Sequence, residues 1–115
     1  MAWKNFNVAP VNEGIHDKFA FEVSETLSAA GNGTTFIVPD EIATIAVTVS
    51  FTGSAKGKMQ HTTDSVAEAK AGTCTWIDWD IGEIGANRTN MCDPVTALRA
   101  VQTDTGTMKV SMRAQ

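Results

Sequence analysis

Residues 42–53 read Ile-Ala-Thr-Ile-Ala-Val-Thr-Val-Ser-Phe-Thr-Gly, and this stretch decides the fold class. Apolar side chains occupy its odd positions, and small or hydroxyl side chains occupy its even positions: Ile45, Val47, Val49 and Phe51 against Thr44, Ala46, Thr48 and Ser50. Successive side chains of a β-strand point to opposite faces, so this alternation with β-branched residues indicates a half-buried strand. A helix would spread the same apolar set around all of its sides.

Further strands are expected on either side, each marked by alternation or by β-branched residues between turn signals. They cover residues 19–25, 34–38, 56–63, 73–81, 95–104 and 107–113, and the chain doubles back around residue 83. A short helix or compact loop is predicted within residues 63–72, where Asp64 or Ser65 could cap the start and Gly72 the end. Short strands separated by turns predict an all-β protein, a single antiparallel β-sandwich that is jelly-roll-like with about eight strands.

The first 17 residues show no regular period. We therefore expect an irregular N-terminal arm at residues 1–17 and one β-sandwich domain at residues 18–115. Two interpretations of the arm stay open. It is either an extension that lies over the domain, or a segment that docks on a partner with Trp3 and Phe6 as anchors, because aromatic residues dominate interface hot spots.

Composition restricts the class of protein. The 115 residues are 43% hydrophobic and 19% charged, which suits one globular domain. The net charge is −4 and no basic cluster occurs, so nucleic acid is not an expected partner. No run approaches 18 consecutive apolar residues, so no membrane segment is expected. The first residues lack an apolar signal region, which favours synthesis in a cytosol without secretion.

Residues 73–81 alternate in a way that separates apolar from acidic side chains. Ile77, Trp79 and Ile81 share one parity, and the other parity carries two aspartates and Trp76. Carboxylates are rarely buried without a partner, so the isoleucine face is expected to lie in the core. Trp76 is then left on the outer face, where it either packs under a loop or contacts another protomer. We predict it as an interface residue.

A turn centred on Glu83 would pair this strand with the one that follows. In that register Asp78 lies opposite Arg88, and Cys74 lies opposite Cys92. Opposed residues of antiparallel strands lie about 4.5–5.5 Å apart between Cα atoms, which is within disulfide range. The register therefore predicts a cross-strand charge pair and a candidate disulfide. Two unpaired thiols are the alternative, favoured by assembly in a reducing cytosol.

Catalytic and metal sites find little support in the spacing of polar residues. Four acidic residues could gather around Ca²⁺: Asp78, Asp80, Glu83 and Asp93. Their spacing is not that of an EF-hand loop, and acidic residues are also expected at a strand edge that faces solvent. A glycosidase pair from Asp78 and Asp80 would need a sugar cleft that the sequence does not indicate. His16 and His61 lack a Gly-x-Ser-x-Gly nucleophile elbow. We expect no enzyme activity, no catalytic residue, no cofactor and no metal ion.

Three segments together resemble a known class of protein. They are Gly-Lys-Met-Gln-His-Thr-Thr-Asp (57–64), Thr-Trp-Ile-Asp-Trp-Asp-Ile-Gly (75–82) and residues 95–115, which begin Val-Thr-Ala-Leu-Arg and end Met-Arg-Ala-Gln. The last segment resembles the closing hairpin of small β-sandwich virion proteins of tailed bacteriophages. It has a strand containing Thr-Ala-Leu-Arg, a Thr-Gly-Thr turn and a final strand that ends in Ala-Gln. The resemblance covers about half of the chain.

The resemblance implies a bacteriophage virion structural protein, of the capsid decoration or head-fibre type. It implies a homotrimer that is assembled into the virion in the host cytoplasm and binds the major capsid protein or another virion protein. Several copies would raise avidity without any single tight contact. The alternative is a carbohydrate-binding β-sandwich module, free-standing or tail-associated, with Trp76 and nearby aspartates contacting a glycan. Exposure of Trp76 on a groove would favour the module.

Overall fold

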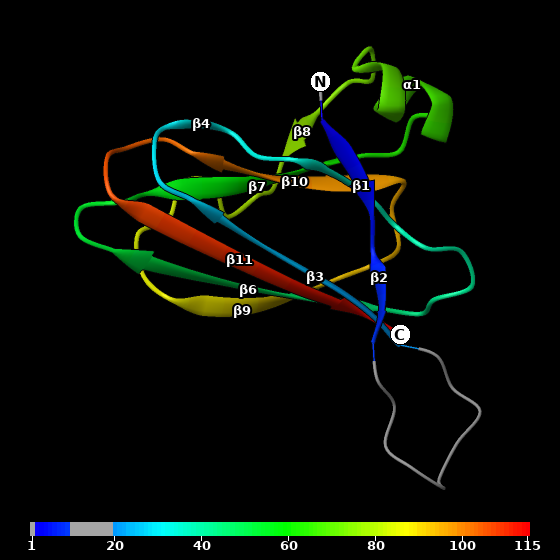
Figure 1. Ribbon diagram of the computed structural model, residues 1–115, viewed down its shortest axis with the longest axis horizontal. Coiled ribbons are helices and arrows are strands. Elements are labelled where there is room, and N and C mark those ends of the chain that lie inside the picture. Colours follow the sequence, from blue (N-terminus) through cyan, green and yellow to red (C-terminus); the bar gives the residue numbers. More distant parts are fainter. Residues whose placement is uncertain (1, 10–19) are drawn as a thin grey trace, which may run out of the picture.

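The computed structural model describes residues 2–9 and 20–115 and contains two β-sheets packed face to face, with one short helix (Figure 1). Sheet A, the upper layer in Figure 1, has the order β1-β5-β10-β7-β8, with β4 also paired to β10. Sheet B has the order β2-β3-β11-β6-β9. The elements are β1 (Trp3–Asn5), β2 (Asn7–Ala9), β3 (Ala20–Leu27), β4 (Gly31–Asn32), β5 (Thr35–Ile37), β6 (Ile45–Thr52), β7 (Gly57–Thr62), α1 (Val66–Ala71), β8 (Ile77–Asp78), β9 (Arg88–Cys92), β10 (Ala97–Gln102) and β11 (Thr107–Ala114).

Eight of these strands follow the path of a jelly roll. The orders β5-β10-β7-β8 and β3-β11-β6-β9 form two four-stranded antiparallel sheets. All but one of the connections between consecutive strands of this set cross to the other sheet, as a jelly roll requires. The predicted all-β, jelly-roll-like sandwich is therefore confirmed. Eleven strands occur in the described residues because β1, β2 and β4 are short additions to the eight.

The core lies between β6 and β11 on one side and β7 and β10 on the other. The odd residues of β6 are buried or nearly so, as the alternation predicted. β11 repeats the pattern with Met108, Val110 and Met112, which are buried. The two strands pair with Val49 opposite Val110, so their apolar faces coincide. Each fully buried large apolar side chain contributes about 1.5–3 kcal/mol to the hydrophobic driving force.

Residues 95–115 supply the central strand of each sheet. β10 lies between β5 and β7, and β11 lies between β3 and β6. The resemblance implied that these two strands form a hairpin. That expectation is wrong, because β10 and β11 belong to different sheets and do not pair with each other. The turn between them requires glycine at position 106. Gly106 has φ 115°, and a Cβ there would lie 2.6 Å from the carbonyl oxygen of Thr52.

The start of the chain is part of the sandwich. β1 pairs in parallel with β5 in sheet A, and β2 pairs with β3 in sheet B. Phe6, between them, is 7% exposed in the core and makes an edge-to-face contact with Phe36 at 6.4 Å between ring centroids. The interpretation that Phe6 anchors the arm on a partner is therefore wrong, because its ring is buried in the core of its own domain. Residues 10–17 of the predicted arm, with His16, lie outside the described residues.

The helix α1 covers one end of the outer face of sheet A. Ser65 caps its start by accepting a hydrogen bond from the Glu68 backbone N–H at 3.2 Å, and Gly72 ends it with φ 79°, as the sequence predicted. Ala69 packs on Ile37 and Ala97 in a small second cluster. At six residues, this helix is the only one in the described residues, and none there is long enough to cross a membrane.

Candidate functional site

A groove opens where the two sheets end on the same side of the sandwich. β8 is the last strand of sheet A and β9 is the last strand of sheet B, and no described strand pairs with the outer side of either. The groove between them has a volume of about 460 Å³. One wall is formed by β7 and residues 77–81, and the other by residues 90–95. This is the candidate site, and we call it the edge groove.

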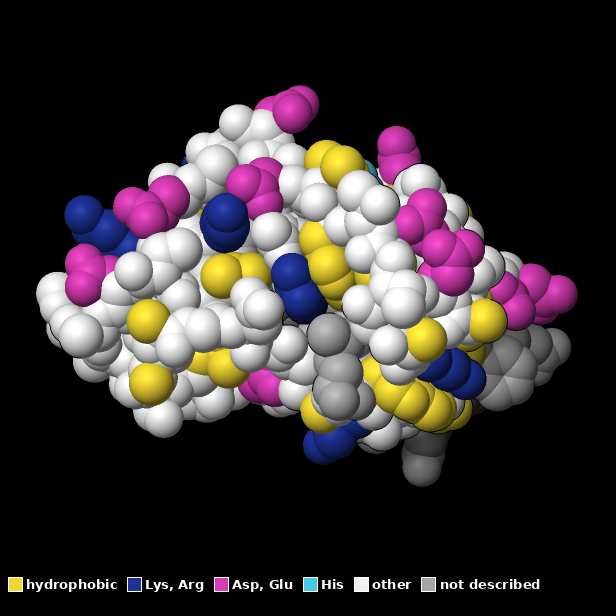
Figure 2. All heavy atoms as spheres, turned by 90° about the horizontal axis from the view of Figure 1, so that it is seen from above, with side chains coloured by type: hydrophobic (Ala, Val, Ile, Leu, Met, Phe, Trp, Pro, Cys, Tyr) yellow, Lys and Arg dark blue, Asp and Glu magenta, His cyan; other side chains and the backbone are white. Residues whose placement is uncertain are grey.

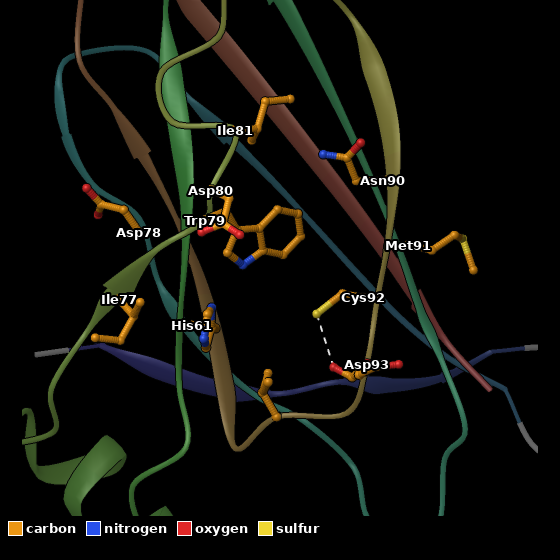
Figure 3. A pocket seen from close by; sticks show the side chains of 11 residues that line it. His61, Ile77, Asp78, Trp79, Asp80, Ile81, Asn90, Met91, Cys92 and Asp93 are labelled. Atoms are coloured by element: carbon orange, nitrogen blue, oxygen red, sulfur yellow. Dashed lines mark hydrogen bonds between the residues drawn. The ribbon is translucent and has the colours of Figure 1, made fainter.

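Side chains from both walls point into the edge groove. Figure 3 shows Trp79 on one wall and Asn90 and Cys92 on the other directed toward the space between them. Met91 alternates with these residues, points away from the centre and is 64% exposed. Ile77 is 51% exposed, because β8 is an edge strand. Apolar side chains are therefore available for contact at both rims.

Backbone hydrogen bonds hold Trp79 in place. Its N–H donates to the carbonyl oxygen of Met59 at 3.0 Å, and its own carbonyl oxygen accepts from the Gly82 N–H at 2.9 Å. The ring packs against the main core while it lines the groove.

Residues 73–81 are mostly a loop, and the predicted nine-residue strand is reduced to the two residues of β8. The expected core position is right for Trp79 and wrong for Ile77.

The predicted hairpin around Glu83 is not formed. β8 pairs with β7 and β9 pairs with β6, so Asp78 and Arg88 lie in different sheets and the predicted cross-strand charge pair is wrong. Cys74 and Cys92 are free thiols. Cys74 packs against the small cluster under α1 and Cys92 against the main core, so the predicted disulfide is also absent.

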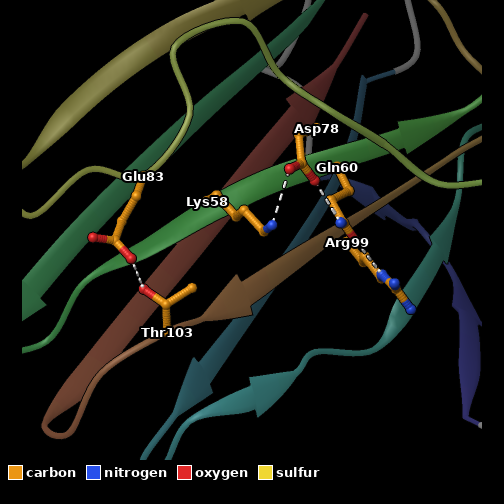
Figure 4. Close-up of polar contacts among 6 residues, drawn as sticks. All are labelled: Lys58, Gln60, Asp78, Glu83, Arg99 and Thr103. Atoms are coloured by element: carbon orange, nitrogen blue, oxygen red, sulfur yellow. Dashed lines mark hydrogen bonds and ion pairs between the residues drawn. The ribbon is translucent and has the colours of Figure 1, made fainter.

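Asp78 instead belongs to a polar row on the outer face of sheet A (Figure 4). Its carboxylate accepts from Lys58 Nζ at 2.9 Å and from Gln60 Nε2 at 2.6 Å. These two hydrogen bonds, with that to Gln60 the stronger influence, lower the pKa of the Asp78 carboxyl. The row continues into sheet A because Arg99 Nε donates to Gln60 Oε1 at 2.7 Å. Asp78 lines the edge groove, but its carboxylate is committed to an ion pair and is directed away from the centre of the groove (Figure 3).

Trp76 and Trp3 each carry a cation over the ring. The Arg99 guanidinium lies 4.4 Å from the centroid of Trp76, and Lys70 Nζ lies 4.2 Å from that of Trp3. Trp76 is partly buried against the cluster under α1, so it packs on its own domain. Trp3 is 39% exposed, on the edge strand β1 of sheet A. Partner binding by Trp3 and an interface at Trp76 stay predictions.

The thiol of Cys92 is kept in its protonated form. Burial, and to a lesser extent the carboxylate of Asp93, raise the pKa of Cys92 above its ordinary value. The Sγ–H also donates to the Asp93 carbonyl oxygen at 3.1 Å. A neutral thiol is a poor nucleophile, so Cys92 acts as an apolar wall of the edge groove at neutral pH.

Charged side chains of both signs occur on the face seen from above sheet A, with hydrophobic atoms between them (Figure 2). Within residues 2–9 and 20–115, no group of three or more His, Cys, Asp or Glu side chains is arranged to hold a metal ion. The acidic residues around the groove carry negative charge without forming a metal centre.

Sequence reasoning missed the wall that β9 contributes. Asn90 and Met91 were not singled out, because the pattern of residues 88–92 is polar and lacks clear alternation. The available signal was a large apolar residue, Met91, in an otherwise mostly polar stretch. Which strand pairs with which decides whether such a residue is covered, and the alternation of one strand does not report its partner.

No protein-family model matches the chain, and no curated protein is significantly similar to it in sequence.

Proposed function

We propose that this protein is a structural component of a tailed-bacteriophage virion, a capsid decoration or head-fibre protein that acts by binding and not by catalysis. One observation carries the proposal. The segment that resembles such proteins, residues 95–115, supplies the central strands β10 and β11 of a jelly roll. Jelly rolls recur in viral capsid domains and in lectins. Since a fold alone does not assign a function, the sequence resemblance selects the virion role.

The outer face of sheet B suits contact between copies of the chain. It holds a shallow hollow of about 540 Å³. Small or hydroxyl side chains line much of it, including Ser24, Ala46, Thr48 and Ser111. An exposed ion pair, Arg113 with Glu22 at 3.7 Å, lies at the same place. Small uncharged side chains allow close approach of two surfaces at little desolvation cost, so we assign this face to a homotrimer contact.

Attachment to the shell would then use other surfaces of each copy. Ile77 and Met91 at the rims of the edge groove are exposed apolar residues that the major capsid protein or another virion protein could cover. A trimer presents three such surfaces, and effective concentration makes their combined binding stronger than one contact. The protein would reside in the virion after assembly in the host cytoplasm.

Light scattering on the purified chain tests the trimer. The expected mass is about three times 12.3 kDa. Thr48→Lys places a charge in the sheet B hollow and is expected to give monomers, because the contact would bury an unpaired charge. Thr63→Lys is the matched control, since Thr63 is exposed and lies outside sheet B. A monomeric wild-type protein would overturn the trimer.

Mass spectrometry of purified particles tests the virion role. The chain is expected among the structural proteins of the phage that encodes it, and recombinant protein is expected to sediment with particles that lack it. Ile77→Asp is expected to reduce this sedimentation, whereas Val66→Asp, at an exposed apolar residue on α1, is expected to leave it unchanged. Absence of the chain from purified particles would overturn the proposal.

The carbohydrate alternative based on Trp76 is not favoured. A sugar platform needs an open aromatic face, but Arg99 covers the Trp76 ring and the cluster under α1 packs against the residue. Asp78, the aspartate closest to Trp76 in the sequence, is committed to Lys58 and Gln60. Trp76 and Asp78 are therefore both engaged within the domain.

A further inference from the structure

The three tryptophans of the chain differ in what covers their rings. Lys70 lies over Trp3, and Arg99 lies over Trp76. No cation lies over Trp79 within the described residues, and its indole N–H has no hydrogen-bond partner there. Trp79 lines the edge groove, and Figure 3 shows its ring directed into that space. It is the one described tryptophan that lines this groove with no cation over its ring.

Polar groups of the edge groove lie around this ring. Asn90 lies on the facing wall. Its Oδ1 accepts from Arg88 Nε at 3.2 Å, which leaves its amide N–H₂ group without a partner in the described residues. Asp80 and His61 line the same groove as Trp79, and no side-chain hydrogen bond engages either within the described residues. The groove therefore combines an aromatic ring with donors and acceptors that have no partner inside the domain.

We propose that the edge groove binds a neutral saccharide, with Trp79 stacked on the apolar face of the sugar ring. A sugar ring presents C–H groups on its faces and hydroxyl groups at its edge. Those hydroxyl groups both donate and accept, so they match the Asn90 amide, the Asp80 carboxylate and the His61 imidazole. Concave sites with an apolar base and a few convergent polar groups are typical of small-ligand binding. This inference goes beyond the virion role and does not depend on it.

Charge restricts the class of saccharide. Three aspartates line the edge groove, and no lysine or arginine does: Asp78, Asp80 and Asp93. A carboxylate ligand would meet like charges without a counter-ion, which is unfavourable. The groove therefore selects neutral hexoses and N-acetylhexosamines against uronic and sialic acids.

A protein segment is the competing occupant. An extended peptide could add to the free edge of β9, because no described strand pairs there. Backbone pairing would not need the indole of Trp79, the amide of Asn90 and the carboxylate of Asp80 to meet in one groove. Side-chain chemistry therefore favours the saccharide, and the experiment below separates the two.

Titration of the ¹⁵N-labelled full chain with methyl glucoside, N-acetylglucosamine and glucuronic acid tests the proposal. The indole N–H signals report each tryptophan, and Trp79→Phe identifies the one in the groove. Methyl glucoside or N-acetylglucosamine is expected to shift the Trp79 signal with a Kd of about 1 mM, as suits so small a ligand. Glucuronic acid, which adds a carboxylate to the same ring, is expected to leave it unmoved.

Variants test each contact. Asn90→Ala and Asp80→Asn are each expected to weaken binding about fivefold, the loss that follows from one hydrogen bond. Asp40→Asn, at an exposed aspartate outside the groove, and Trp76→Phe are matched controls with unchanged affinity. Asn90 lies on an edge strand, so its variant keeps the test available if Trp79→Phe does not fold.

Three outcomes would overturn the saccharide site. The first is no shift of the Trp79 signal by either neutral sugar. The second is an equal affinity in Asn90→Ala and the wild type. The third is a Trp79 signal that moves only when particles or their shell protein are added, which would make the groove a protein-docking site. Particle sedimentation is measured separately, so failure of the saccharide site leaves the virion role standing and the reverse also holds.

Discussion

The guanidinium of Arg99 lies 4.4 Å from the ring centroid of Trp76, and its Nε donates to Gln60 Oε1 at 2.7 Å. One side chain of β10 thus joins the loop after α1 to the neighbouring strand β7. Through Gln60 and Asp78, the same row reaches the edge strand β8. The contact orients the segment that leads into the edge groove.

Arg99→Met is expected to lower the free energy of unfolding by about 1–2 kcal/mol, because it removes a cation–π contact and a hydrogen bond. Urea unfolding followed by fluorescence measures the loss. Arg113→Met is the matched control. Its ion pair with Glu22 is exposed and 3.7 Å long, so a change near zero is expected. Equal losses in the two variants would contradict the role given to Arg99.

Asp78 is expected to titrate with a pKa below the ordinary value of an aspartate, since Gln60 and Lys58 donate hydrogen bonds to its charged form. A carboxyl whose pKa is lowered by folding stabilises the folded state above the unfolded pKa. That contribution is lost as pH falls through the folded pKa. Carboxyl ¹³C chemical shifts measure the titration. Lys58→Met is expected to raise the pKa of Asp78, and Lys109→Met, on sheet B, to leave it unchanged.

Phe6→Ala is expected to destabilise the fold by about 3–5 kcal/mol, because it empties a buried aromatic site beside Phe36. Thermal and urea unfolding measure this change. Val8→Ala, two residues along and 65% exposed, is expected to cost less than about 0.5 kcal/mol. If Phe6→Ala unfolds at the wild-type midpoint, the N-terminal strands do not contribute to the core.

Gly57→Ala is expected to destabilise the fold by about 1–3 kcal/mol through overpacking. A Cβ at position 57 would press on the Met108 side chain and lie 2.7 Å from the Val101 carbonyl oxygen. Gly85→Ala serves as the control, because its Cβ would come no closer than 3.4 Å to the Lys56 side chain. Urea midpoints compare the two variants, and a tolerated Gly57→Ala would contradict the close approach of β7 and β11.

Thiol titration under denaturing, non-reducing conditions is expected to find two free cysteines per chain. In the folded protein at pH 8, Cys92 is expected to be alkylated more slowly than a free model thiol, since its raised pKa leaves less thiolate. Asp93→Asn removes a negative charge and is expected to speed the reaction. A mass lower by two hydrogens and no reactive thiol would instead indicate a disulfide.

Most of the fold could be predicted because alternation reports which face of a strand is buried. β6 and β11 show this clearly, and Ser65 and Gly72 marked the helix ends because capping depends on local chemistry. Pairing is not local. The prediction of a hairpin around Glu83 rested on the assumption that consecutive strands pair. In the jelly roll, β8 and β9 belong to different sheets. Trp79 and Asn90 lie on facing walls that come from different sheets, so the edge groove could not be predicted from either segment alone.

The position of β10 and β11 at the centre of the two sheets sets an order on biosynthesis. β3, β5, β6 and β7 emerge from the ribosome first, yet each lacks a neighbour until residues 97–114 arrive. Neither sheet can be completed before then, so the nascent chain exposes unpaired strand edges that can associate with other chains. A chain that stops short of residue 97 would lose the middle of both layers at once and would be left to chaperones or proteases.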